Sequence, residues 1–291
     1  MFVIMGATGQ TGGATLRELR RRGATVRAIT RDPQRASFGE GVEAVRGDPT
    51  DGTGLAAAFA GAEAAYVMLP PLLQAEDVLA ASKDVSQAIA DAVRDARVPY
   101  VVALSSGGAH LADGSGILRT LYDFERALRM TGAAITFLRA GNFMEDWVSV
   151  LAVARSEGVL PSGHAPLDTP METVSTEDIG GCAAALLLDP VPGERIVNCL
   201  GPQDYTPTDA AAALTRLLGR PVTAVVASRD DTLAGLLAAG MSGDCAEKVV
   251  ELSEGLNAGR IFFEPVGETR RGNVTLEQAL RRLIAEAAPG C

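Results

Sequence analysis

Short strand-like segments alternate with helix-like segments along the first half of the chain. Segments with the apolar and β-branched residues of buried parallel strands lie at residues 2–5, 25–29, 42–45, 64–69, 100–104 and 135–138. Helix-like segments separate them at residues 15–22, 52–60, 76–96 and 118–130. Repeated βαβ units with right-handed crossovers predict an α/β fold with a doubly wound parallel sheet.

Beyond residue 139 this alternation breaks down. Helices are predicted at residues 143–157, 176–188, 208–218, within 232–256 and at 275–287, strands at 195–200 and 222–227, and a proline-rich loop at 160–171. Thr176 is the predicted N-cap of helix 176–188, because Glu177 and Asp178 follow in its first turn. No linker separates two units. We therefore predict a domain of residues 1–140 and a smaller lobe of residues 141–291, with segments of the lobe returning to the sheet.

A glycine-rich turn joins the first strand to the first helix. Gly6 permits a sharp exit from the strand, Gly9 lets the backbone approach a pyrophosphate, and Gly12 lets the helix lie close to the sheet. Backbone N–H groups at the helix start then face the phosphates. A tight turn without a ligand is the alternative interpretation. We predict nucleotide binding by the residues Gly6, Thr8, Gly9, Gln10, Thr11 and Gly12.

Composition and charge narrow the classes of protein. The 291 residues are 47% apolar and 21% charged, which is ordinary globular composition. A net charge of −10 argues against nucleic acid or an anionic membrane as the main partner. Neither a transmembrane segment nor a signal peptide is expected. The cysteines lack CxxC spacing and there are 2 histidines, so we expect no metal site and a reduced, cytoplasmic protein.

The end of the second strand indicates which dinucleotide is bound. An acidic side chain there binds the ribose 2′-OH of NAD, whereas an arginine accommodates the 2′-phosphate of NADP. Thr30 occupies the expected acidic position and Arg31 follows it, which favours NADP(H). Asp32 at the 2′-OH, with Arg31 as a solvated loop residue, is the alternative. Asp48 follows the third strand, where its carboxylate would contact the adenine or would only stabilise a turn.

Further segments combine with this turn into a recognisable order. Gly47-Asp48 follows the third strand, LRAGNFME occupies residues 138–145, and TEDIG occupies residues 176–180. Over about residues 1–200 the sequence resembles the NmrA-like family of atypical short-chain dehydrogenase/reductases. The resemblance implies that residues 1–140 form an NADP-binding Rossmann domain, that residues 141–291 are mainly a substrate-binding lobe, and that a cleft lies between them.

The same resemblance implies contacts and activities. Asn142 and Phe143 would lie near the nicotinamide end of the cofactor, and Leu69, at the end of the fourth strand, is a further predicted cofactor contact. Members of the family include NADPH-dependent quinone reductases and other reductases. They also include proteins that bind NADP without turnover and act as redox sensors.

A reductase needs a proton donor beside the acceptor, and the wider superfamily supplies it with a Tyr-x-x-x-Lys pair. This chain has Tyr122 followed by Arg126 at that spacing. The register disfavours the pair: if Glu125 is the glutamate that follows the family's lysine by four residues, Leu121 and Ile117 occupy the Lys and Tyr positions. Tyr122 is therefore a candidate donor whose alternative role is packing against the sheet or a subunit.

Other candidate polar groups follow the fifth strand. Ser105 and Ser106 lie at its carboxyl end, where ligands bind in parallel sheets, although either could only cap a turn. Ser105 is predicted both as a catalytic residue and as a cofactor contact. His110 in the next, glycine-rich loop is a candidate proton donor or a surface residue. Water could also supply the proton to a quinone or an activated alkene.

The predicted cleft is apolar, which favours a planar or hydrophobic acceptor. Its expected walls are residues 70–73, Phe143, Met144, Trp147 and Met171. We expect an NADPH-dependent reductase of a quinone, an enone or a similar small molecule. The alternatives are a non-catalytic NADP(H)-binding regulator that acts through a protein partner, and an isomerase or lyase without net redox. A homodimer is one further expectation.

Overall fold

The computed structural model describes residues 1–50, 52 and 54–286, and its centre is a parallel sheet of 8 strands. The strand order is β12-β10-β6-β5-β4-β1-β2-β3, with parallel pairing throughout. The predicted doubly wound sheet is confirmed. In sequence order the strands are β1 (Phe2–Ile4), β2 (Val26–Thr30), β3 (Val42–Arg46), β4 (Ala64–Val67), β5 (Tyr100–Ser106), β6 (Ala134–Ala140), β10 (Glu194–Leu200) and β12 (Glu268–Arg271).

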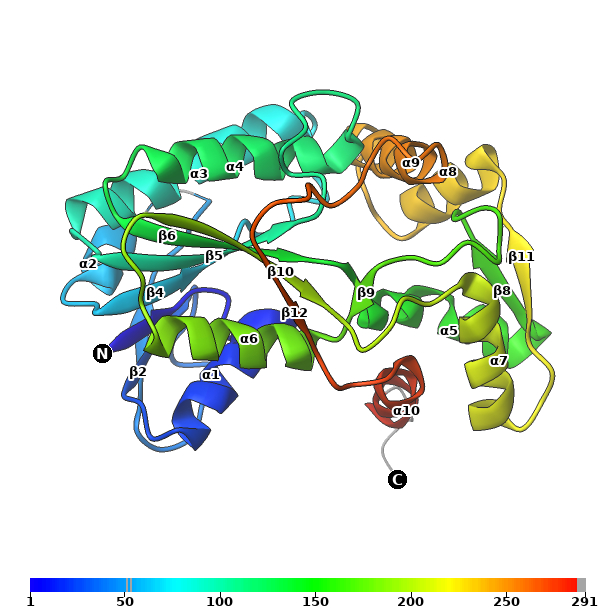
Figure 1. Ribbon diagram of the computed structural model, residues 1–291, viewed down its shortest axis with the longest axis horizontal. Helices are drawn as coiled ribbons and strands as arrows, with labels where there is room; N and C mark the ends of the chain where they lie inside the picture. Colours follow the sequence, from blue (N-terminus) through cyan, green and yellow to red (C-terminus); the bar gives the residue numbers. More distant parts are fainter. Residues whose placement is uncertain (51, 53, 287–291) are drawn as a thin grey trace.

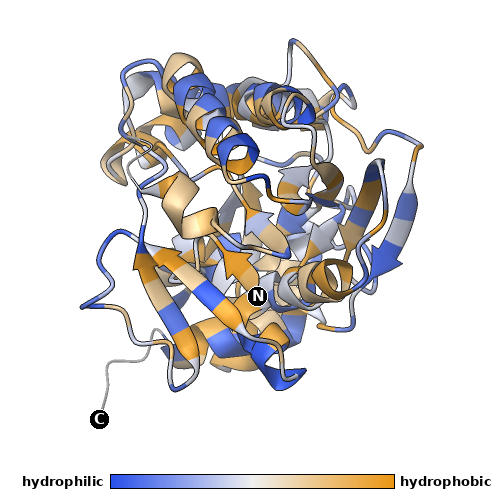
Figure 2. Cartoon of the chain, turned by 90° about the vertical axis from the view of Figure 1, so that its left-hand side faces the viewer, coloured by the Kyte–Doolittle hydropathy of each residue, from blue (hydrophilic) through white to orange (hydrophobic). Residues whose placement is uncertain are grey.

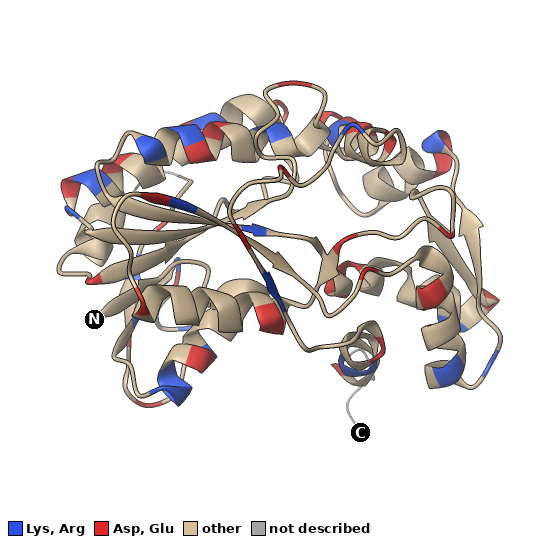
Figure 3. Ribbon diagram, viewed as in Figure 1, with Lys and Arg blue, Asp and Glu red and all other residues tan. Residues whose placement is uncertain are grey.

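Helices cover both faces of this sheet (Figure 1). One face carries α1 (Gln10–Arg21) and α6 (Thr176–Leu188), and the other carries α2 (Leu55–Phe59), α3 (Val78–Asp95) and α4 (Arg119–Arg129). Each layer encloses its own apolar core. The strands between the layers are mostly hydrophobic in Figure 2, whereas charged residues gather on the outer helices in Figure 3.

The remaining elements form a smaller lobe beyond the carboxyl ends of the strands, on the right in Figure 1. A buried apolar cluster that includes Met144, Leu160, Leu214 and Leu280 holds this lobe together. The lobe contains β7 (Asn142–Phe143), the 3₁₀ helix η2 (Met144–Val150), α5 (Leu151–Glu157), β8 (Val159–Ser162), β9 (Thr173–Val174), α7 (Pro207–Leu218), β11 (Thr223–Val226), α8 (Arg229–Ala238), α9 (Gly243–Asn257) and α10 (Leu276–Glu286). A short 3₁₀ helix, η1 (Gly116–Leu118), precedes α4.

The strand order predicts a ligand crevice beside β1, outside the carboxyl ends of the inner strands. β1 pairs with β2 on one side and with β4 on the other, so the chain reverses its winding direction there. In open α/β sheets, ligands bind outside the carboxyl ends of the strands at such a point. The glycine-rich turn after β1 lies at this position.

Several predicted boundaries and elements were wrong. Ser175, not Thr176, caps α6, because the Ser175 side chain accepts a hydrogen bond from the Asp178 N–H and Thr176 is already helical. Phe143 lies in β7, so the predicted helix 143–157 begins later and has a 3₁₀ first part. The predicted loop 160–171 begins within β8, a strand whose sequence, VLPS, contains a proline.

The sequence pattern did not predict the polar edge strand β12. β12 has the sequence ETRR, and because it lies at the edge of the sheet it needs no alternation of apolar residues. Residues 53 and 287, which belong to the predicted helices 52–60 and 275–287, and Cys291 lie outside the described residues.

The described part of the chain has neither a membrane-spanning helix nor a cluster of metal-ligating side chains. None of its helices combines the length and the apolar composition needed to cross a bilayer. Within the same residues, no three His, Cys, Asp or Glu side chains gather as they would around a metal ion.

Candidate active site

A cavity of about 590 Å³ opens between the carboxyl ends of the strands and helix α9. One end is formed by the glycine-rich turn and the other by the lobe. Most of the lining side chains are apolar. The lining residues are Gly9, Gln10, Thr11, Met68, Leu69, Pro70, Pro71, Leu72, Leu73, Val78, Ser82, Leu104, Ser105, Ser106, Ile117, Leu118, Thr120, Leu121, Ala140, Gly141, Asn142, Phe143, Asp146, Cys245, Val249 and Leu252.

The glycine-rich turn has the geometry of a phosphate-binding loop. Gly6 adopts a φ of +68°, and its carbonyl accepts a 2.8 Å hydrogen bond from the Gly9 N–H. A Cβ on Gly12 would overlap the carbonyl oxygen of Gly6, so only glycine fits there. The first turn of α1 contains no acidic residue, and Gly9 offers no side-chain cap, whereas α6 has both an acidic first turn and a serine cap. The N-terminus of α1 is therefore suited to an anion.

Three predicted cofactor contacts, Thr8 of the glycine-rich turn and Arg31 and Asp48 for the adenosine part, do not line the cavity. Arg31 is exposed in the bend after β2, and Thr8 is exposed in the turn. The carboxylate of Asp48 accepts hydrogen bonds from the N–H and the hydroxyl of Thr50, at 3.0 and 2.7 Å. Asp48 thus stabilises a local turn through one carboxylate oxygen. Its side chain as a whole is half-buried.

The predicted contacts for the nicotinamide end come together in the cavity wall. Leu69, Ser105, Asn142 and Phe143 all line it. Asn142 is fixed from behind, because its main-chain N–H and its side-chain amide both donate to the carbonyl of Glu172, at 2.9 and 3.1 Å. Three segments far apart in sequence therefore meet at this end of the cavity.

The Ser105 side chain is hydrogen-bonded to a buried network of charged side chains. Its hydroxyl donates a 2.7 Å hydrogen bond to Glu125 Oε1. Glu125 also accepts from Arg139 through both oxygens, at 3.0 and 2.9 Å, and from Arg129 at 3.1 Å. Arg139 continues the network to Glu264 at 2.9 Å. Since the Ser105 proton points at a carboxylate, the free lone pairs of its oxygen make it a hydrogen-bond acceptor toward the cavity.

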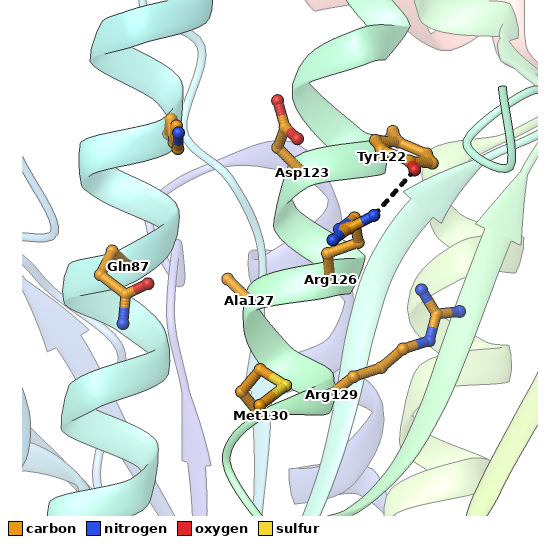
Figure 4. A pocket seen from close by; sticks show the side chains of 8 residues that line it. Gln87, Tyr122, Asp123, Arg126, Ala127, Arg129 and Met130 are labelled. Carbon is orange, nitrogen blue, oxygen red and sulfur yellow. Dashed lines mark hydrogen bonds between the residues drawn. The ribbon is translucent and has the colours of Figure 1, made fainter. Parts of the chain in front are cut away.

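Two candidate proton donors lie away from this cavity. The ring of His110 packs edge-on against Phe262, with centroids 5.1 Å apart, and neither ring nitrogen has a hydrogen-bond partner among the described residues. Tyr122 lies in a separate groove along α3 and α4, where its hydroxyl accepts a 3.0 Å hydrogen bond from Arg126 (Figure 4). Ile117 and Leu121 line the main cavity instead.

Sequence reasoning missed two parts of the cavity wall. Cys245, Val249 and Leu252 project from α9, which the sequence identified only as part of a helical region. Their spacing of three and four residues marks one helical face, but nothing in the sequence says what that face covers. Asp146 directly follows the LRAGNFME segment and lines the cavity as well.

Two neighbouring carboxyl groups in η2 have opposite surroundings. Glu145 accepts hydrogen bonds from the N–H and the hydroxyl of Thr176, at 3.0 and 2.9 Å, and so holds the start of α6. Burial raises the pKa of Glu145, although the Thr176 donors oppose the shift. Asp146 faces the cavity, where burial among protein atoms and then the charge of Glu145 raise the pKa of its carboxyl to about 6.

Comparison with known proteins finds relatives over most of the chain. The model of the NmrA-like family matches residues 1–262. A (4-alkanoyl-5-oxo-2,5-dihydrofuran-3-yl)methyl phosphate reductase of Streptomyces griseus is 30% identical over 224 residues, 76% of this chain and 75% of that protein. An NAD(P)H azoreductase of Xenophilus azovorans is 25% identical over 256 residues, 87% and 86% of the two chains.

Solved structures share the fold over nearly the whole chain. A triphenylmethane reductase from Citrobacter sp. superposes with a TM-score of 0.81 and 21% identity, covering 98% of this chain and 99% of that one. An NADPH-dependent quinone oxidoreductase from Escherichia coli, complexed with NADPH, gives a TM-score of 0.80 and 23% identity, covering 98% and 100%.

Proposed function

The chain belongs to the NmrA-like family, and from that premise we propose that it is a cytoplasmic NADPH-dependent reductase of a small apolar acceptor such as a quinone or an enone. The names of the relatives support a reductase, because the relatives from Streptomyces and Xenophilus are both named as reductases. Cys182, Cys199 and Cys245 are unpaired, which fits a reducing compartment.

The observation that carries the proposal is the continuity of the cavity. It begins at the exposed residues Gly9 and Gln10 at the start of α1 and runs to apolar walls made by Leu72 and by Val249 of α9. A dinucleotide bound at the turn would therefore extend its reactive end into a mainly apolar space. Such a space suits a planar hydrophobic acceptor better than a sugar or a phosphate.

The residues of this chain divide the binding of NADP(H) between them. The N-terminus of α1 binds the pyrophosphate. Arg31 binds the 2′-phosphate, and Asp48 contacts the adenine. When bound, the cofactor supplies a hydride. Ser105, whose proton is engaged by Glu125, accepts a hydrogen bond from the nicotinamide carboxamide or the substrate. Asn142 and Phe143 complete that end of the site.

We also propose that the reduction proceeds without a Tyr-x-x-x-Lys pair. Ile117 and Leu121 occupy the cavity wall where the register argument places those two residues. Tyr122 and Arg126 bond to each other in a different groove. Since water suffices as a proton source for an activated acceptor, this arrangement is compatible with turnover.

The second candidate function is a non-catalytic NADP(H)-binding regulator that acts through a protein partner. The position of Tyr122 favours it, because a typical proton donor of the superfamily is then missing from the cavity. Both functions require cofactor binding, so binding alone does not separate them.

The deciding experiment measures NADPH oxidation by the purified protein with a panel of quinones and enones, with NADH as the comparison. The reductase proposal expects turnover with at least one acceptor and a lower KM for NADPH than for NADH. No turnover with any acceptor, together with tight and unequal binding of NADP and NADPH, would establish the regulator instead.

A further inference from the structure

The cavity contains one carboxyl group whose position no sequence motif explains. Of the described residues that line it, Asp146 alone carries a carboxyl, and Cys245 is the other group among them that titrates. The Cys245 side chain is only 1% exposed, and burial raises the pKa of its thiol. Asp146 is by contrast an exposed residue, and it lines the same cavity. It is therefore the accessible acid in this space.

Asp146 follows closely on the two residues that are predicted to contact the nicotinamide. It lies in η2, directly after β7, whose two residues Asn142 and Phe143 line the same cavity. β7 pairs with β9, and the Met144 side chain is fully buried in the lobe, so this part of the chain is anchored. A carboxyl group on an anchored segment can be presented to a substrate at a fixed position.

The charges around Asp146 favour its protonated form. Neighbouring protein atoms partly desolvate the Asp146 carboxyl although the residue stays exposed, and this desolvation, followed by the charge of the adjacent Glu145 carboxylate, raises its pKa to about 6. Glu145 in turn is held by Thr176, and Arg282 of α10 acts on Glu145.

Charged groups on α5 and α10, which pack against η2, and on α9, which lines the same cavity, are engaged elsewhere. Arg282 pairs with Glu177 at the start of α6, and Arg155 of α5 donates to the carbonyl of Ile284. Asp244 at the start of α9 accepts from the Val78 N–H. Cys245, on α9, lines the same cavity in its thiol form. No cation among these compensates Asp146 directly.

We propose that Asp146 is the general acid that protonates the acceptor during its reduction. The inference rests on the proposed reductase function and adds the proton donor to it. A carboxyl group that lines the substrate space and keeps its proton to a higher pH than an ordinary aspartate has the properties required of a general acid.

The step balances in atoms and electrons. The acceptor gains a hydride and its electron pair from NADPH, which is oxidised to NADP⁺. The electrons of the conjugated carbonyl shift onto its oxygen, and the O–H bond of the Asp146 carboxyl breaks as its proton forms the new O–H bond. Asp146 is left as a carboxylate and takes up a proton from solvent, so each turnover consumes one proton.

The test compares Asp146→Asn with wild type across pH, with Glu157→Gln as the matched control. Asparagine keeps the size of the side chain but has no proton to give. Glu157 is an exposed carboxylate at the end of α5, and it does not line the cavity. Wild type and Glu157→Gln should lose kcat about tenfold per pH unit above the pKa of the acid. Asp146→Asn should be about 100-fold slower at low pH and flat across the range.

A series of quinones distinguishes loss of the acid from a folding defect, because a folding defect would lower the activity with every quinone by the same factor. Acceptors whose reduced oxygen is more basic need the acid more, so the Asp146→Asn defect should grow with that basicity. A defect that is equal for all acceptors, or an unchanged pH profile, would overturn the role of Asp146 and leave the reductase intact. No turnover by wild type with any acceptor would overturn both proposals.

Discussion

The hydroxyl of Ser105 donates a 2.7 Å hydrogen bond to the carboxylate of Glu125, and both side chains are at most 3% exposed. The same carboxylate pairs with Arg139, which is 2% exposed, so the cavity floor rests on a buried ion pair. Breaking such a pair by removing one partner leaves an uncompensated charge in a dry environment. The network therefore couples the stability of the fold to the orientation of Ser105.

Glu125→Gln tests this coupling. We expect the free energy of unfolding to fall by about 3–5 kcal/mol, because the buried Arg139 loses its main counter-charge. Urea unfolding followed by circular dichroism measures it. Glu18→Gln, which breaks a pair on the surface of α1, should cost less than about 1 kcal/mol. Equal effects of the two substitutions would contradict a structural role for the buried network.

Gly180→Ala and Gly181→Ala form a matched pair on α6. A Cβ on Gly180 would overlap Ala14 of α1, whereas a Cβ on Gly181 meets nothing within 4 Å. We expect Gly180→Ala to destabilise by roughly 1–3 kcal/mol through overpacking. Gly181→Ala should be neutral or stabilise by up to about 1 kcal/mol through helix propensity. Thermal unfolding of both variants checks the contrast, and the reverse order would show that α1 and α6 pack differently.

Arg31→Asp should change the preference between the two dinucleotides. If Arg31 binds the 2′-phosphate, its loss should raise the Kd of NADPH at least about tenfold, since a hydrogen bond to a charged group contributes about 1.5–3 kcal/mol. The Kd of NADH should change little. Fluorescence titration measures both, with the exposed neighbour Arg35→Asp as the control. An equal loss of affinity for the two dinucleotides would exclude this role of Arg31.

Leu252→Trp should separate the acceptor end of the cavity from the cofactor end. Leu252 lines the cavity from α9, so a larger side chain there removes space for the acceptor. We expect kcat/KM for a bulky quinone to fall about tenfold while the Kd of NADPH stays the same. Glu254→Trp, at an exposed position of the same helix, should leave both constants near those of wild type. Loss of NADPH affinity in Leu252→Trp would place the cofactor deeper than proposed.

Asp146→Asn should also alter stability as a function of pH. The pKa of Asp146 rises from its ordinary value of 3.8 to about 6 in the folded protein, so charging this group costs free energy in the folded state. That cost is absent below pH 4, grows between pH 4 and 6, and is constant above. The variant should therefore gain stability relative to wild type across this window. A difference that does not vary with pH would contradict the shift.

The sequence predicts the sheet and the glycine turn because local physics determines both. The strands β1, β4 and β5 are buried on both faces and therefore carry continuous apolar residues. The turn at Gly6 and Gly12 is dictated by a positive φ and a close approach, which glycine alone satisfies. Such local requirements restrict which residue types can occur at these positions, so they can be recognised in the sequence.

The cavity walls could not be predicted in the same way, because tertiary contacts create them. Asp146 follows Glu145 in the sequence, yet Glu145 binds Thr176 at the start of α6, whereas Asp146 faces the cavity. His110 follows the glycine-rich segment after β5, yet its ring packs against Phe262, more than a hundred residues later. The alternation of apolar and polar residues carries no information about such distant partners.

The main-chain hydrogen bond from Ser242 to the carbonyl of Leu73, together with the bond from the Val78 N–H to the Asp244 carboxylate, joins the late helix α9 to the loop after β4. These ties span more than half of the chain. During synthesis the amino-terminal strands emerge first and can begin to pair while α9 is still inside the ribosome. The nucleotide turn is thus available early, and the acceptor space closes only when translation is almost complete. A truncated product that stops before residue 243 would retain the glycine turn but lack one wall of the cavity.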